Sequence, residues 1–285
     1  MATLKEIRAR IRAAKNIQQI TRAMKLVAAA RLKRATDRVL EARPYSDKMR
    51  EFMASLATAG ELPSHPLMAK REVKKVCVIV ITSDRGLAGA YNTSLIRKAS
   101  DFLRGATTPT TLITVGKKAT QFFSKRGYDM AASYSVPSSG ARFQDAQEVY
   151  RKAKGMFESG EVDAIYVVYS KFFSAIRQTP QLVQLLPIEP PPASEQSGAS
   201  DYTFEPSSES VLNALLPRYF LTLVWQALLE STASEFGARM TAMTSATDNA
   251  GKMINTLTLK ANRERQAGIT KEILEVVGGA EALKN

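Results

Sequence analysis

Cysteine and histidine are almost absent from this chain of 285 residues. Cys77 is the only cysteine and His65 is the only histidine. An intrachain disulfide, a cysteine-based metal cluster, a zinc site and a histidine-based catalytic triad are therefore excluded. No metal or cofactor is expected, and the lone cysteine fits a reducing compartment. Because His65 lies between two prolines, it is expected to be an exposed loop residue.

Long hydrophobic runs are also lacking. The longest strongly apolar runs, Val76 to Thr82 and Tyr219 to Leu229, are shorter than the ~20 residues needed to cross a bilayer. The first residues have neither the apolar core nor the cleavage site of a secretory signal. These features predict a protein that is soluble or peripheral to a membrane.

Proline is missing from both ends of the chain. Residues 1–43 contain none, and Pro217 is the last one. Thr3 and Glu6 have the spacing of a capping box, which predicts a helix beginning near Thr3. At 1.5 Å per residue, the first segment would form a helix of roughly 65 Å, and residues 218–285 one of roughly 100 Å. Pro44 is expected only to kink the first helix, because helix-favouring sequence resumes after it.

Both terminal segments have apolar or small residues at steps of three and four, which is typical of a coiled-coil seam. The first seam contains Leu4, Ile7, Ile11, Ala14, Ile17, Ile20, Met24, Val27, Ala28, Leu32, Ala35, Val39 and Ala42. The second contains Leu221, Trp225, Leu228, Thr232, Phe236, Met240, Met243, Ala246, Ala250, Ile254, Leu257 and Ala261. We expect the two helices to form a long antiparallel coiled coil. Two separate helices on a common core are the alternative.

The net charge of +13 is concentrated at the N-terminus. Residues 1–43 hold twelve Lys and Arg against three Asp and Glu, whereas residues 218–285 hold eight against seven. A basic helix can meet nucleic acid, anionic lipid or an acidic protein surface, and its charge does not choose among them.

The middle of the chain alternates between strand and helix patterns. Strands are predicted at 73–82, 110–115, 163–170 and 179–187, the last antiparallel, and helices at 92–103, 117–126 and 143–158. This alternation predicts an α/β domain with a small, Rossmann-like, mainly parallel sheet. The expected domains are an N-terminal coiled-coil helix (1–59), a central α/β domain (60–208, with a Pro/Ser-rich loop at 189–208) and a C-terminal coiled-coil helix (209–285).

No pattern in the sequence predicts an active site. The turn from Ser83 to Ala90 follows a strand and precedes a helix, where α/β proteins bind phosphate. It lacks Gly-Lys-Ser/Thr, and its glycine spacing misses the dinucleotide fingerprint, so a structural turn is favoured. Two alternatives stay open at this point: an enzyme using this turn, and a basic coiled-coil protein that binds nucleic acid or acts as a scaffold.

The predicted C-terminal helix is rich in Gly, Ala and Ser between residues 234 and 255. Glycine costs ~1 kcal/mol relative to alanine inside a helix, so its presence needs a reason. Close approach of a partner helix is one explanation. A thin, smooth shaft that fits inside another protein is the other.

Several motifs occur in order along nearly the whole chain. They are Ile20-Thr-Arg-Ala-Met24-Lys-Leu-Val-Ala28, Thr82-Ser-Asp-Arg-Gly-Leu87, Ala233-Ser-Glu-Phe-Gly-Ala-Arg-Met240 and Arg265-Gln-Ala-Gly-Ile-Thr270. Together they resemble the gamma subunit of bacterial F-type ATP synthases. One departure is in the turn after Leu87, where the family often has a Gly-Gly pair and this chain has alanine at positions 88 and 90.

The resemblance implies a non-catalytic rotor subunit. The terminal helices would lie inside a hexamer of alpha and beta subunits, and the α/β domain would form a foot against the epsilon subunit and the c-ring. The chain would couple c-ring rotation to conformational change at the ATP sites of the beta subunits. It would be peripheral to the cytoplasmic face of the bacterial plasma membrane, attached only through the complex, and would need no nucleic acid.

The resemblance also implies contact residues, although no catalytic, cofactor-binding or metal-binding residue. Those expected to meet the beta subunit are Lys15, Met24, Lys25, Lys33, Arg265 and Gln266. Those expected to meet the c-ring and epsilon at the foot are Tyr202, Phe204 and Glu205.

Overall fold

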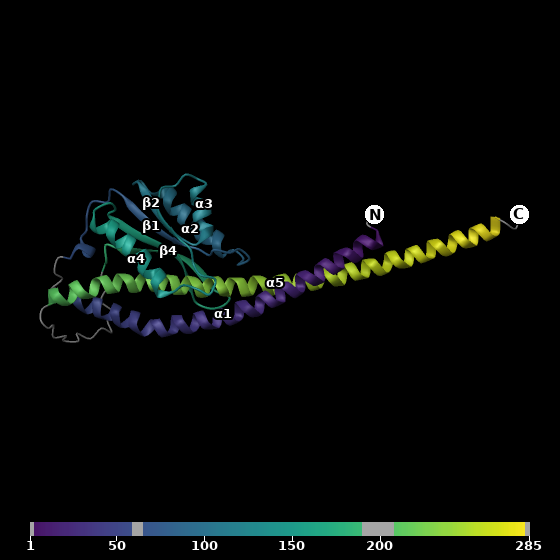
Figure 1. Ribbon diagram of the computed structural model, residues 1–285, viewed down its shortest axis with the longest axis horizontal. Coiled ribbons are helices and arrows are strands. Elements are labelled where there is room, and N and C mark those ends of the chain that lie inside the picture. Colours follow the sequence, from purple (N-terminus) through teal and green to yellow (C-terminus); the bar gives the residue numbers. More distant parts are fainter. Residues whose placement is uncertain (1–2, 59–64, 190–207, 283–285) are drawn as a thin grey trace. The chain divides into compact units, whose positions relative to one another are not determined.

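The computed structural model describes residues 3–58, 65–189 and 208–282 (Figure 1). Its elements are α1 (Leu4–Thr58), the short 3₁₀-helix η1 (Pro66–Met68), β1 (Val76–Ile81), α2 (Tyr91–Gly105), β2 (Thr110–Val115), α3 (Lys117–Ser124), β3 (Met130–Tyr134), α4 (Phe143–Glu158), β4 (Ala164–Phe172), β5 (Gln178–Leu186) and α5 (Ser208–Ala282). The chain divides into two compact units, Met1–Val27 with Met240–Asn285 and Ala28–Arg239. Helices α1 and α5 contribute to both.

The larger unit contains one five-stranded sheet in the order β3-β2-β1-β4-β5. Strands β3, β2, β1 and β4 run parallel to one another, and β5, at the edge, is antiparallel to β4. All six residues of β1 are buried, because this central strand is covered on both faces. The prediction of a mainly parallel sheet with an antiparallel last strand is confirmed.

Helices α2 and α3 lie on one side of this sheet and α4 on the other (Figure 1), and a hydrophobic core lies on each face. Val78 and Val80 face the core formed with α2 and α3, whereas Cys77 and Ile79 face the core formed with α4 and α5. Burial raises the pKa of the Cys77 thiol to about 12, so the thiol is protonated and unreactive at neutral pH.

The predicted helix boundaries are right at some positions and wrong at others. The capping box is confirmed: the Glu6 amide donates to Thr3 Oγ1 (3.3 Å), and the Thr3 amide donates to Glu6 Oε2 (3.1 Å). Helix α1 also continues through Pro44, as expected. Helix α5 begins at Ser208 and includes Pro217, whereas the proline-free segment expected to form the long helix began only at residue 218, within the C-terminal domain expected from 209.

Burial explains why α5 continues through Pro217. Leu212 and Leu216, just before Pro217, are fully buried in the core with α4. A proline inside a helix costs about 3 kcal/mol, and two buried leucines contribute stabilisation of comparable size. Tertiary packing therefore outweighs the local preference at this position.

Two further expectations were wrong. Strand β3 was missed because it is short, lies at the sheet edge and lacks a clear apolar alternation. His65 is buried rather than exposed, and its Nδ1 accepts a hydrogen bond from the Leu67 amide (3.0 Å) at the start of η1. Burial lowers the pKa of His65, so the neutral form that can accept this bond is favoured.

One helical segment is long and apolar enough, by length and composition alone, to cross a membrane. Ser210–Gly279 contains an 18-residue window with a mean hydropathy of 1.2, of which 39% is buried. The strongly apolar run from Tyr219 to Leu229 is shorter than such a window, which can include up to two charged residues. Core helices of globular proteins pass the same test, and several residues at the start of this segment are core residues.

Candidate functional site

In the smaller unit, α1 and α5 pair as antiparallel helices. Thr247 Oγ1 donates to Thr21 Oγ1 at 2.9 Å, and an added Cβ at Gly251 would lie 3.0 Å from Gln18 Nε2. Moving forward along α5 therefore means moving backward along α1. The predicted antiparallel pairing of the terminal helices is confirmed.

The buried seam is narrower than the sequence analysis predicted. Within the smaller unit, Ile7, Ala14 and Thr21 are buried at intervals of seven, whereas Ile17 and Ile20 are more than half exposed. Val27 is exposed as well. The assignment of Ile17, Ile20 and Val27 to the buried seam was therefore wrong. Helix α1 has one partner helix in this unit, and one partner can cover only a single heptad stripe.

The last part of α5 is not covered by any described residue. From Arg265 to Gly279 every residue is exposed. This stretch nevertheless contains large apolar side chains: Ile269 (48% exposed), Ile273 (57%), Leu274 (65%), Val276 (72%) and Val277 (58%). Such a surface on an isolated helix is unfavourable in water and is typical of a protein interface.

The residues expected to contact the beta subunit lie on both helices. Lys15 is exposed on α1 and Lys33 is exposed further along it, whereas Met24 and Lys25 are half-buried. Arg265 and Gln266 are exposed on the uncovered part of α5. The residues expected at the foot, Tyr202, Phe204 and Glu205, lie outside the described residues.

The lysines and arginines in the first three quarters of α1 form no ion pair with any described residue, whereas Lys48, nearer its end, pairs with Glu51 (2.7 Å). No ion pair among residues 3–58, 65–189 and 208–282 includes a lysine or arginine between Lys5 and Arg43. Arg31, in the larger unit, instead lies over the ring of Phe236 (5.9 Å to the centroid). The charge of the basic helix is therefore available to an external partner.

In the larger unit, α5 is attached to the end of strand β4 by polar side chains. The Ser170 amide donates to Ser231 Oγ (3.1 Å), and the Ser170 carbonyl accepts from Ser234 Oγ (3.0 Å). The Phe172 amide donates to Glu230 Oε2 (3.3 Å). We call Glu230, Ser231 and Ser234 with these backbone groups the β4–α5 contact. Sequence reasoning missed it, although polar residues interrupting an apolar helix were a signal that could have found it.

Gly237, on the same segment of α5, lies close to the turn that joins β4 and β5. A Cβ at Gly237 would lie 3.2 Å from the Ala175 carbonyl oxygen, in the turn between β4 and β5. In the smaller unit, a Cβ at Gly251 would lie 3.0 Å from the end of the Gln18 side chain on α1. A Cβ at Gly268 would meet nothing within 4 Å among the described residues. Close packing therefore accounts for Gly237 and Gly251, and Gly268 has no such reason within the described chain.

The turn from Ser83 to Ala90 makes hydrogen bonds within the protein. Ser83 donates through its amide and its hydroxyl to Asn92 Oδ1 (both 3.0 Å). Asp84 Oδ1 accepts from the amides of Lys117 (2.9 Å) and Val136 (3.3 Å), which joins the segments that follow β1, β2 and β3. These contacts support the structural interpretation of the turn that the sequence favoured.

The same turn contacts α5 through Arg239, which also forms a buried ion pair within the helix. Arg239 Nη2 lies 2.7 Å from Glu235 Oε1 and donates to the Gly86 carbonyl (3.4 Å). Burial raises the pKa of Glu235, and the charge of Arg239 opposes this rise. The β4–α5 contact and the bond from Arg239 to Gly86 attach successive turns of α5 to the α/β domain.

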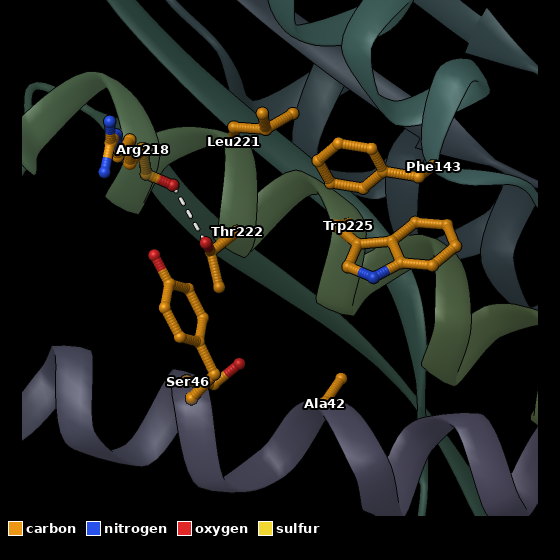
Figure 2. A pocket seen from close by; sticks show the side chains of 8 residues that line it. Ala42, Ser46, Phe143, Arg218, Leu221, Thr222 and Trp225 are labelled. Carbon is orange, nitrogen blue, oxygen red and sulfur yellow. Dashed lines mark hydrogen bonds between the residues drawn. The ribbon is translucent and has the colours of Figure 1, made fainter.

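A hollow of about 330 Å³ lies between α1, α4 and α5 within the larger unit. Figure 2 shows Trp225 and Phe143 side by side on one wall; their rings are perpendicular, with centroids 5.7 Å apart. The hollow is lined by Ala42, Tyr45, Ser46, Phe143, Arg218, Leu221, Thr222 and Trp225. The Ser46 hydroxyl is buried without a hydrogen-bond partner among the described residues.

Comparisons with known proteins match the chain over nearly its full length. The family model described as ATP synthase covers residues 3–283. An ATP synthase gamma chain from Pelotomaculum thermopropionicum is 46% identical over 284 residues, which is 100% of both chains. One from Brevibacillus brevis is 48% identical over 282 residues, or 98% of both chains.

Solved structures agree with these relatives. A chain in the central stalk and c-ring structure of the Tetrahymena thermophila mitochondrial ATP synthase is 26% identical, with a TM-score of 0.61 over 80% of this chain and 99% of that one. A chain of the Euglena gracilis mitochondrial ATP synthase has a TM-score of 0.70 at 19% identity, over 98% and 94%, and supports the fold. The chain therefore belongs to the family of ATP synthase gamma chains.

Proposed function

We propose that this chain is the central rotor shaft of a proton-translocating F-type ATP synthase. It couples rotation of the c-ring to conformational change at the ATP sites of the beta subunits and carries no catalytic site itself. The observation that carries the proposal is the uncovered apolar surface of α5 beyond Ala261, in a chain whose relatives are ATP synthase gamma chains.

The uncovered end of α5 suits a shaft that is surrounded by other subunits. Ile273 and Val276 would be buried by an apolar sleeve, at a gain of roughly 1–2 kcal/mol each. Gly268 keeps the helix narrow where no described residue approaches it. Arg265 and Gln266 lie beside this surface and would provide polar contacts to the beta subunit.

The lysines of α1 that have no ion pair among the described residues suit a partner that changes as the shaft turns. Lys15, Lys25 and Lys33 would face acidic groups of the beta subunit, with Met24 between them. An exposed ion pair is worth at most about 1 kcal/mol, so each contact can form and break without locking the rotor. Coupling requires that such contacts differ between the conformational states of the partner.

The larger unit is suited to transmit torque to α5. The β4–α5 contact and the hydrogen bond from Arg239 to the Gly86 carbonyl join the helix to the α/β domain through directional bonds, which resist rotation better than apolar contacts alone. The partners proposed for this chain are the alpha and beta subunits, epsilon and the c-ring. It would be peripheral to the cytoplasmic face of the bacterial membrane, with the region of Tyr202 to Glu205 facing the c-ring and epsilon.

The proposal is tested by replacing Arg265 and Gln266 together with alanine in the assembled enzyme. ATP synthesis by membrane vesicles is expected to fall roughly five- to tenfold, the effect of losing two exposed polar contacts. The matched control replaces the exposed neighbours Asn262 and Arg263 with alanine, and a smaller effect is expected. Unchanged synthesis in the first variant, with the complex intact, contradicts the assignment of these two residues.

A further inference from the structure

A second hollow, of about 410 Å³, lies between α2 and α3 on the face of the sheet away from α4. We call it the α2–α3 hollow. It is lined by Thr93, Ile96, Arg97, Ser100, Arg104, Phe122, Arg126 and Tyr128. Its volume lies in the range of small-molecule sites. None of these residues takes part in the β4–α5 contact or in the paired helices.

The α2–α3 hollow has an excess of positive charge. Arg104 is paired with Asp101 and donates to the Ser100 carbonyl (3.3 Å). Arg97 and Arg126 have no carboxylate partner in the part of the chain that the structure describes. Two of the three guanidinium groups are therefore available to an anion.

One of these groups is already held in position. Arg126 lies over the ring of Phe122, 3.6 Å from its centroid, and its Nη1 donates to the Phe122 carbonyl (3.2 Å). The remaining N–H groups of a fixed guanidinium suit phosphate oxygens, because their planar geometry matches two oxygens at once. Arg97 reaches the hollow from α2, on the other side.

A polar group without a partner also lines the hollow. The Ser100 hydroxyl is buried and has no hydrogen-bond partner among the described residues. Leaving such a group unpaired costs about 1–3 kcal/mol. A ligand that accepts a hydrogen bond from Ser100 would remove this cost, which favours an occupant with oxygen or nitrogen acceptors.

The remaining surface of the hollow is apolar and rigid. Tyr128 packs edge-on against the fully buried Phe123 (5.2 Å between centroids), and Phe123 packs edge-on against Phe122 (5.1 Å). Ile96 completes this surface from α2. Free phosphate would leave it uncovered, whereas a ligand that joins phosphate to a flat ring would cover it.

We propose that the α2–α3 hollow binds a nucleoside phosphate, with its phosphate oxygens on Arg97 and Arg126 and its base against Ile96 and Tyr128. The site is separate from the turn at Ser83 and from the catalytic sites that the proposed function assigns to the beta subunits. It is a binding site without chemistry, because the described lining residues include no general base or metal ligand beside the arginines.

The test is titration of the full-length chain with ATP by isothermal calorimetry, in parallel with pyrophosphate. ATP is expected to bind at least about tenfold more tightly than pyrophosphate, because the base covers the apolar surface. The double variant Arg97→Gln and Arg126→Gln is expected to weaken ATP binding by about tenfold or more, and Ser100→Ala by a few-fold.

Arg85→Gln is the matched control, since Arg85 is an exposed arginine of the same unit that lies on the Ser83 turn rather than in the hollow. Its ATP affinity is expected to match that of the unchanged chain. The proposal is overturned by any of three results: no ATP binding at ~5 mM, equal affinity for pyrophosphate, or loss of binding in Arg85→Gln while the double variant still binds. Tighter binding of polyglutamate than of ATP at the same arginines overturns it in favour of an acidic peptide.

Discussion

The Arg239 guanidinium lies 2.7 Å from the Glu235 carboxylate one turn earlier on α5, and only 11% and 13% of the two side chains are exposed. Asp84 and Arg31 also act on the Glu235 carboxylate. The two buried charges therefore depend on each other, and removing one leaves the other without its nearest counter-charge.

Replacing Arg239 with methionine is expected to lower the free energy of unfolding by about 3 kcal/mol, because it leaves Glu235 charged, buried and unpaired. The double variant that also carries Glu235→Gln should recover much of this loss. Urea denaturation followed by the fluorescence of Trp225, the only tryptophan, measures both. A double variant that is less stable than Arg239→Met would show that the pair is not the cause.

The same variant has a pH dependence of defined sign. Burial raises the pKa of Glu235 in the folded state above 4.5, and loss of Arg239 raises it further. Stability from a raised acid pKa is complete below the unfolded-state pKa and is lost as the pH increases through the folded-state pKa. The deficit of Arg239→Met should therefore be largest near pH 7 and shrink towards pH 4.5, as denaturation at several pH values would show.

Two buried serines are expected to respond oppositely to the same substitution. Ser46 has a buried hydroxyl without a partner among the described residues, so Ser46→Ala should stabilise the protein by about 1 kcal/mol. The Ser234 hydroxyl donates to the Ser170 carbonyl, so Ser234→Ala should destabilise it by about 1–2 kcal/mol. Chemical denaturation of the two variants side by side checks the contrast, and equal shifts would contradict it.

Alanine substitutions at two glycines with positive φ, Gly127 and Gly140, are expected to differ in their cost to stability, because only one of the added Cβ atoms would collide with another side chain. Gly127 has φ +72° with nothing near an added Cβ, whereas Gly140 has φ +106° and its Cβ would lie 2.9 Å from Thr232 Cγ2 on α5. Gly127→Ala should cost roughly 1–2 kcal/mol from strain alone. Gly140→Ala should cost more, because Thr232 must also move, and a smaller loss at Gly140 in thermal unfolding would disprove this explanation.

Local patterns were enough to predict much of the fold. The apolar run of β1 and the helical period of α4 each correspond to an element in the structure, because their burial pattern is set within the element. The antiparallel pairing of the terminal helices also followed from two seams in one chain. Strand β3 and the continuation of α5 through Pro217 could not be predicted, since both depend on packing against residues far away in the sequence.

The candidate site was predictable to a lesser degree. The seam was assigned too broadly because Ile17 and Ile20 have the right spacing and only the geometry of a single partner helix excludes them. The β4–α5 contact was missed because Ser231 and Ser234 act on backbone groups of a strand about sixty residues earlier. Sequence periodicity shows which face of a helix is apolar, and it does not show which backbone groups a polar residue will meet.

The charge of α1 leads to a last prediction on the assembled enzyme. Replacing Lys15, Lys25 and Lys33 together with glutamine is expected to lower ATP-driven proton pumping several-fold at low salt, because three weak contacts to an acidic surface are lost. None of the three has an ion pair within the described residues, so the chain itself should fold as before.

Salt provides the discriminating measurement. Added salt screens exposed charge pairs, so pumping by the unchanged enzyme should fall towards that of the triple variant as ionic strength increases. The control replaces Lys98, Lys117 and Lys125, exposed lysines of the larger unit, and should keep the salt response of the unchanged enzyme. If both triple variants lose activity equally, total charge rather than the position of these lysines on α1 determines the effect, and the proposed contact with the beta subunit is wrong.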